Sequence, residues 1–130
     1  MKLVICEKPS VGAAVAAALG VTGRKDGYIE NDKYIISWCI GHLVQLSEAA
    51  AYGEQYKKWS YDSLPILPQE WQYTVAADKG KQFKILKDLM HRADVSEVVN
   101  ACDAGREGEL IFRFVYNMCG CKKPYFRLWI

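Results

Sequence analysis

Acidic residues directly follow two short apolar segments that lie far apart in the chain. Glu7 comes after Val4-Ile5-Cys6, and Asp103 comes after residues 98–102. Short β-branched runs of this kind predict strands that are buried on both faces. In an open parallel sheet, functional groups collect at the carboxyl ends of the strands. If the two strands are neighbours, Glu7 and Asp103 face the same crevice.

A third acid, Glu107, stands four residues after Asp103 at the expected start of a helix, from which it can turn back toward the crevice. Carboxylates that converge without basic partners repel one another unless a cation lies between them. An all-oxygen ligand set favours Mg²⁺ over zinc or copper, and Mg²⁺ with few protein ligands is common at phosphate-transfer sites. The three acids therefore predict a Mg²⁺ site.

A purely structural interpretation of the same acids stays open at this point. Asp103 could serve only as a turn or N-cap residue, and Glu107 and Glu109 could be favourable acids in the first turn of a helix. A capping box would place the acid three residues after the cap, whereas the gap here is four. Gly105 and Gly108 do not match the glycine patterns of dinucleotide-binding or P-loop proteins, so we expect no nucleotide cofactor.

Strands and helices alternate around these acids, which predicts an α/β fold with a mostly parallel central sheet, flanking helices and an inserted hairpin. The expected strands are residues 2–6, 71–75, 96–102 and 125–130, and a hairpin joins residues 28–30 to 33–39. The expected helices are residues 9–19, 81–92 and a segment that carries Leu110 to Met118. We expect residues 47–69 to form a packed connection with short helical pieces, and Trp38, Trp59 and Trp71 to lie in the core.

Bulk properties indicate a single domain, residues 1–130. Of the 130 residues 51% are apolar and 25% are charged, which suits a folded chain with one core. No apolar run reaches the roughly 18 residues that span a bilayer, and no secretory signal follows Met1, so we expect a cytoplasmic protein with no membrane partner. The chain ends within an apolar segment, which suggests an N-terminal fragment of a longer protein.

The cysteine count and the net charge exclude little. Five cysteines without a C-x-x-C pair favour reduced structural thiols over a zinc site or a disulfide framework. The formal net charge of +2 is too small to identify a nucleic-acid partner. The partner must be inferred from the motifs.

Four segments of the chain, in the same order, resemble the N-terminal Toprim domain of the DNA topoisomerase III family, which are type IA enzymes. The likeness covers nearly the whole chain and implies a Toprim fold with a Rossmann-like sheet, Mg²⁺ as the cofactor and single-stranded DNA as the partner. The segments are Cys6-Glu7-Lys8-Pro9-Ser10, Trp38-Cys39-Ile40-Gly41-His42-Leu43, Leu64-Pro65-Ile66-Leu67-Pro68 with Trp71-Gln72, and Asp103-Ala104-Gly105-Arg106-Glu107-Gly108-Glu109.

The resemblance also implies a reaction that this segment does not complete alone. In the family, a tyrosine attacks a phosphodiester of single-stranded DNA and becomes linked to the 5′ phosphate. A second strand passes through the gap, and the break is resealed without ATP. None of the eight tyrosines here lies in a matching motif. We therefore expect the nucleophile in the remaining domains of the same chain, and we expect this segment alone to be inactive.

The matching motifs imply roles for four residues. Glu7 matches a glutamate that shuttles a proton at the leaving 3′ oxygen or assists metal binding. Lys8 matches a lysine that contacts the scissile phosphate, where a cation offsets developing charge. Asp103 and Glu107 match metal-binding acids.

Two further residues have an open role, and one position departs from the family pattern. By resemblance, Arg106 either reaches a DNA phosphate or pairs with a nearby acid, and His42 either donates to a DNA phosphate or is structural. Gly105 stands where the family's D-x-D-x-E pattern has a second aspartate, so one metal ligand is missing. We do not expect Glu109 to replace it, because two residues along a helix turn a side chain well away.

Two other functions compete with a topoisomerase fragment. One is a stand-alone Mg²⁺-dependent nucleic-acid-binding module that cleaves nothing. The other is a different Toprim enzyme, such as a primase or a small-RNA nuclease. Residues 7–10 and 40–43 belong to the topoisomerase pattern and argue against that second alternative.

Overall fold

The structure is a computed structural model that describes residues 1–129, and a mixed β-sheet lies at its centre. Within these residues the strand order is β2-β3-β4-β1-β7-β8. Strands β4, β1, β7 and β8 run parallel, whereas β2, β3 and β4 pair antiparallel at one edge. The strands are β1 (Lys2–Cys6), β2 (Gly23–Lys25), β3 (Tyr28–Glu30), β4 (Tyr34–Trp38), β7 (Glu97–Ala101) and β8 (Tyr125–Arg127).

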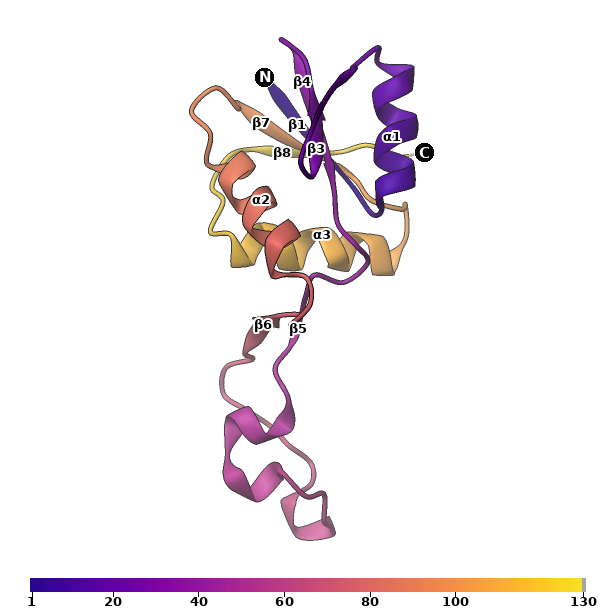
Figure 1. Ribbon diagram of the computed structural model, residues 1–130. Helices are drawn as coiled ribbons and strands as arrows, with labels where there is room; N and C mark the ends of the chain where they lie inside the picture. Colours follow the sequence, from indigo (N-terminus) through magenta and orange to yellow (C-terminus); the bar gives the residue numbers. More distant parts are fainter. Residues whose placement is uncertain (130) are drawn as a thin grey trace.

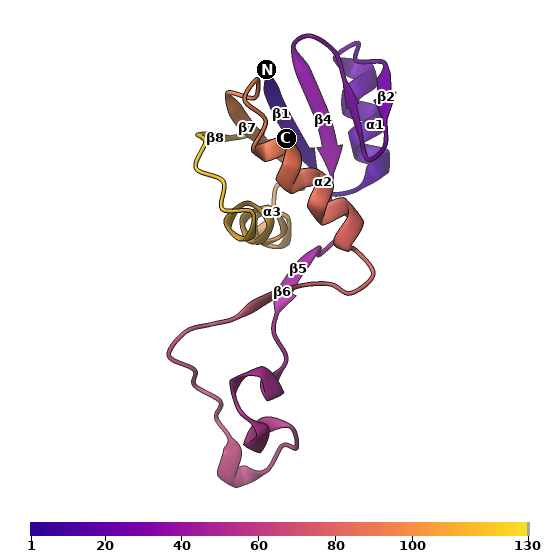
Figure 2. The same cartoon turned by 60° about the vertical axis from the view of Figure 1, so that its left-hand side comes forward.

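Helices cover both faces of this sheet, with α1 (Pro9–Ala18) on one face and α2 (Gly80–Met90) and α3 (Arg106–Met118) on the other (Figures 1 and 2). The side chains of β1 alternate between the two cores, as the period of a strand requires. Leu3 and Ile5 pack with α2 and α3, while Val4 and Cys6 pack with α1. Because both faces of β1 are buried, this strand is apolar along most of its length.

The register of the parallel strands aligns their carboxyl ends. Cys6, the last residue of β1, pairs with Trp38 at the end of β4 and with Ala101 at the end of β7. The loops that leave these three strands therefore start side by side at one edge of the sheet. This edge is where the sequence predicts the functional groups.

A smaller sheet and a protruding segment complete the fold. Strands β5 (Val44–Leu46) and β6 (Tyr73–Val75) pair antiparallel below the main domain. Between them, residues 47–72, which we call the arm, extend away from the three layers (Figures 1 and 2). The arm contains three short 3-10 helices, η1 (Ala49–Tyr52), η2 (Glu54–Tyr56) and η3 (Tyr61–Ser63).

The predicted fold class is confirmed, with differences at element ends. The predicted hairpin is present, and β2 extends it to a three-stranded antiparallel edge. The predicted helix 81–92 is α2, and the predicted strand 96–102 is β7. The predicted strand 71–75 begins only at Tyr73 and pairs with β5, which was not predicted. The predicted strand 125–130 is β8, which ends already at Arg127; Leu128 and Trp129 are not in a strand, and Ile130 lies outside the described residues.

The predicted burial of two tryptophans is wrong. Trp38 packs against the core beneath α1, as expected, and lies so close to Gly12 that a Cβ there would collide with its ring. Trp59 and Trp71, in contrast, are 77% and 55% exposed. Both lie in the arm, where no second layer formed by residues 1–129 faces them. Residues 47–69 form the short helical pieces that we predicted, but they do not form a packed connection.

Candidate functional site

Loops from three adjacent strands meet at the carboxyl edge of the sheet, and Glu7 lies among them. The Glu7 carboxylate accepts a hydrogen bond from the backbone N–H of Asp103, at 3.2 Å. The Glu7 carbonyl accepts one from the N–H of Gly41, at 3.3 Å. Residues far apart in the sequence are thus joined around Glu7, and the predicted proximity of Glu7 and Asp103 is present in the structure.

The turn from Asp103 into α3 is tight. The N–H of Gly105 donates to the Asp103 carbonyl at 2.8 Å, and α3 begins at the next residue, Arg106. A Cβ at Gly108 would collide with the Asp103 backbone. Gly108 is therefore needed because the first turn of α3 lies directly on this backbone. This close packing places the first turn of α3 beside Asp103, which itself contacts Glu7 at the end of β1.

Glu107 contacts His42 rather than the other two acids. The Nε2 atom of His42 lies 3.4 Å from a carboxylate oxygen of Glu107, whose side chain is 76% exposed. This contact is an ion pair when His42 is protonated. The loop that carries His42 is held by the residue that precedes α2, since the Lys79 ammonium donates to the His42 carbonyl at 3.2 Å. His42 and Glu107, both predicted site residues, thus come together across the site.

Lys8 and Arg106 are exposed at the starts of α1 and α3. Within residues 1–129, neither side chain forms an ion pair. The Arg106–acid pairing that the sequence left open is therefore not formed among these residues. Two exposed cations next to the strand ends are available for an anion such as a phosphate.

A polar network behind the turn was missed by the sequence analysis. The Asn100 side chain is fully buried, and it donates to a Glu109 carboxylate oxygen at 2.9 Å. Arg127 of β8 donates to the Asp103 carbonyl at 2.5 Å, and its Nε atom lies 3.6 Å from Glu109. Glu109 also accepts from Arg113 at 2.8 Å. The sequence feature that could have indicated this network is Asn100, a polar residue within an apolar segment of the chain.

Comparison with known proteins agrees with this architecture. The sequence profile of the Toprim domain matches residues 2–130. The chain belongs to the Toprim domain family. The resemblance to Toprim proteins is thereby confirmed.

Among proteins that carry this domain, the chain is similar to several named DNA topoisomerase 3. It is 46% identical over 129 residues to the protein of Shouchella clausii, and 44% identical over 128 residues to those of Staphylococcus haemolyticus and Bacillus thuringiensis. These matches cover 98–99% of this chain but only 18% of each relative. The Toprim domain described here thus corresponds to a small part of a much longer polypeptide in these relatives.

The site of this Toprim domain offers oxygen ligands, and their chemistry fits Mg²⁺. Glu7, Asp103 and Glu107 supply only carboxylate oxygens, and the Asp103 and Glu107 side chains are exposed. Among residues 1–129, however, no three His, Cys, Asp or Glu side chains lie close enough to hold a metal ion together. Since Mg²⁺ usually takes one or two carboxylates and keeps several waters, a closed protein cage is not required.

The described part of this Toprim domain contains neither a disulfide nor an apolar spanning helix. All five cysteines are free and buried, which confirms the prediction of structural thiols. Burial raises the pKa of Cys6 to about 12, so this thiol beside the site stays protonated and unreactive at neutral pH. None of the helices in residues 1–129 has the length and apolar character needed to cross a bilayer.

Proposed function

We propose that this Toprim domain forms the metal- and phosphate-binding half of the active site of a type IA DNA topoisomerase. The observation that carries the proposal is the hydrogen bond between the Glu7 carboxylate and the backbone of Asp103, which joins the ends of β1 and β7. The attacking tyrosine belongs to the part of the polypeptide that the relatives have beyond the matched segment. Single-stranded DNA is the substrate in this proposal.

Each site residue has one task in this proposal. Asp103 and Glu107, with help from Glu7, hold Mg²⁺, which when bound offsets the negative charge of the DNA phosphates. Glu7 holds or moves a proton at the leaving 3′ oxygen. Lys8 binds the scissile phosphate.

Arg106 and His42 bind neighbouring phosphates of the same strand. Exposure of Arg106 supports this task, because its guanidinium forms no ion pair with an acid among residues 1–129 that it would have to break before it binds DNA. The His42 ring, in contrast, is held near the site by its contact with Glu107.

The test uses a chimera in which this chain replaces the segment that it matches in the topoisomerase 3 of Shouchella clausii. Glu7→Gln keeps the shape of the side chain and removes its ability to exchange a proton. We expect the variant to bind single-stranded DNA with unchanged affinity and to lose cleavage by about 100-fold or more, as for removal of a general acid–base group. Asp32→Asn, in the exposed turn between β3 and β4, is the matched control. A Glu7→Gln chimera with full cleavage activity would refute the proposal.

A further inference from the structure

The arm projects from the domain, and few contacts with the rest of the described chain account for its conformation (Figures 1 and 2). None of its three 3-10 helices contains a buried residue. It nevertheless contains several exposed large apolar side chains, including Trp59, Tyr61 and Leu67 at 77%, 100% and 78% exposure. A domain that stands alone rarely exposes apolar side chains in such a group, and such a group usually marks an interaction surface. Leu64 and Trp71 of the arm are also exposed.

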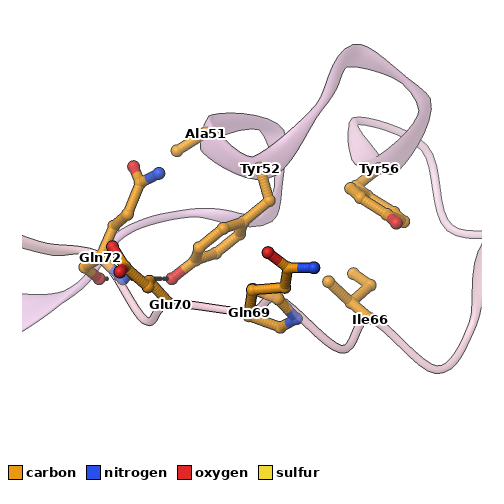
Figure 3. A pocket seen from close by; sticks show the side chains of 8 residues that line it. Ala51, Tyr52, Tyr56, Ile66, Gln69, Glu70 and Gln72 are labelled. Carbon is orange, nitrogen blue, oxygen red and sulfur yellow. Dashed lines mark hydrogen bonds between the residues drawn. The ribbon is translucent and has the colours of Figure 1, made fainter.

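Polar contacts give the arm a definite shape despite the lack of a core. The Tyr52 hydroxyl accepts a hydrogen bond from the N–H of Gln72 at 2.9 Å and donates to its carbonyl at 3.3 Å, so η1 is tied to the returning strand (Figure 3). Ser60 and Ser63 form a capping box around η3. Beside Tyr52 lies an open hollow of about 350 Å³, lined by Tyr56, Ile66 and other residues of the arm (Figure 3).

The charges of the arm indicate which class of partner covers it. The arm has two cations, Lys57 and Lys58, and four acids, which gives a formal charge of −2. A surface that binds nucleic acid neutralises phosphates with an excess of Lys and Arg. The arm has the opposite excess, so its aromatic residues do not mark a DNA-stacking surface. The acids are Glu48, Glu54, Asp62 and Glu70.

We propose that the arm is a docking surface for the remaining domains of a topoisomerase 3 polypeptide, an inference that rests on the proposed function. The relatives match this chain over only 18% of their length, so about four fifths of each relative is available to cover the arm. The covering surface is apolar and has a rim with more basic than acidic residues. An aromatic side chain buries about 150–250 Å² in a contact, so Trp59, Tyr61 and Trp71 supply a large part of the roughly 800 Å² per partner of a standard interface.

Hydrogen exchange measured by mass spectrometry tests this docking without any activity assay. The isolated chain is compared with the Shouchella clausii chimera described above. We expect amides of residues 47–72 to exchange at least about tenfold more slowly in the chimera. Amides of β1, which is already buried, report whether the domain is folded equally in both proteins. Equal exchange of the arm in the two proteins would overturn the proposal.

Two other outcomes also overturn it and identify a different occupant. Slow exchange of the arm in the isolated chain that depends on protein concentration indicates a second copy of the chain. Slow exchange that requires an added single-stranded oligonucleotide indicates nucleic acid.

A pair of chimera variants separates docking from the proposed function. Trp59→Ala combined with Tyr61→Ala is expected to restore fast exchange of the arm by at least about tenfold, since it removes two of the most exposed aromatic side chains. Leu19→Ala, which truncates an exposed side chain beyond the end of α1, is the matched control and is expected to leave the arm protected. Glu7→Gln is also expected to leave it protected, so failure of the catalytic proposal and failure of the docking proposal give different results.

Discussion

At the residue scale, the acids around the turn before α3 fall into two groups. Glu109 is occupied by Asn100 and two arginines, which makes it a structural acid. Asp103 and Glu107 are exposed and their carboxylates are accessible to an ion.

We expect Asp103→Ala combined with Glu107→Ala to abolish Mg²⁺ binding, or to weaken it well beyond tenfold, in isothermal titration calorimetry. Glu54→Ala combined with Asp62→Ala, two exposed acids of the arm, is the matched control. Identical heats for the site variant and the wild type would remove the metal assignment.

Gly105 offers a direct test of the missing ligand. Its φ of −163° and ψ of 174° are extended backbone that any residue adopts, and a Cβ built there meets no atom within 4 Å. Gly105→Asp therefore introduces a carboxylate next to Asp103 without strain. We expect Mg²⁺ affinity to increase several-fold, because affinity grows with the number of charged oxygen ligands. Gly105→Asn, which has the same shape without the charge, is the control in the same titration. An equal affinity for the Asp and Asn variants would show that this position does not face the ion.

At the element scale, the carboxyl ends of β1 and β7 were predictable because short apolar runs followed by an acid are a local signal. The polar side chains that support these strand ends were not predictable. Asn100, Glu109 and Arg127 become neighbours only when β8 pairs with β7 and α3 packs below, and a single sequence does not state that pairing. The contact of His42 with Glu107 likewise depends on the relative placement of two loops.

Arg127 is the element-scale link between β8 and the turn from Asp103 into α3. It donates to the Asp103 carbonyl, and only 20% of its side chain is exposed. Arg127→Gln removes this charged donor and loosens the turn, so we expect Mg²⁺ affinity to fall about tenfold, as for other residues that support metal ligands. Arg113→Gln is a matched control, since Arg113 also binds Glu109 but does not reach Asp103. The two variants are compared by calorimetry and by near-ultraviolet circular dichroism. Equal affinities for both would show that Arg127 does not position the turn.

At the scale of the whole molecule, the layers of the fold could be predicted from the sequence, but the exposed arm could not. The alternation of strands and helices predicted the sheet, since each apolar run needs a covering layer. Apolar and aromatic residues at positions 59–71 predicted burial by the same logic. That logic failed because it assumes that the covering layer belongs to the same domain. The exposed arm is consistent with a domain that completes its packing against other parts of a longer polypeptide.

The two cores together make the stability of the whole molecule sensitive to alkaline pH. Burial raises the pKa of Cys6 beneath α1, and that of Cys119 in the other core, to about 12 from an ordinary value of 9.0. Between these values the unfolded chain loses a proton that the folded chain keeps, so the free energy of unfolding falls as pH rises above 9 and is highest below it. From pH 8 to pH 10 each thiol contributes a loss of at most about 1.4 kcal/mol in the free energy of unfolding.

Urea unfolding at the two pH values is expected to show a smaller loss of unfolding free energy in Cys119→Ala than in the wild type. Because the two proteins differ only at this residue, the comparison isolates the thiol. An identical pH dependence for the two proteins would mean that the Cys119 thiol ionises as readily in the folded chain as in the unfolded one.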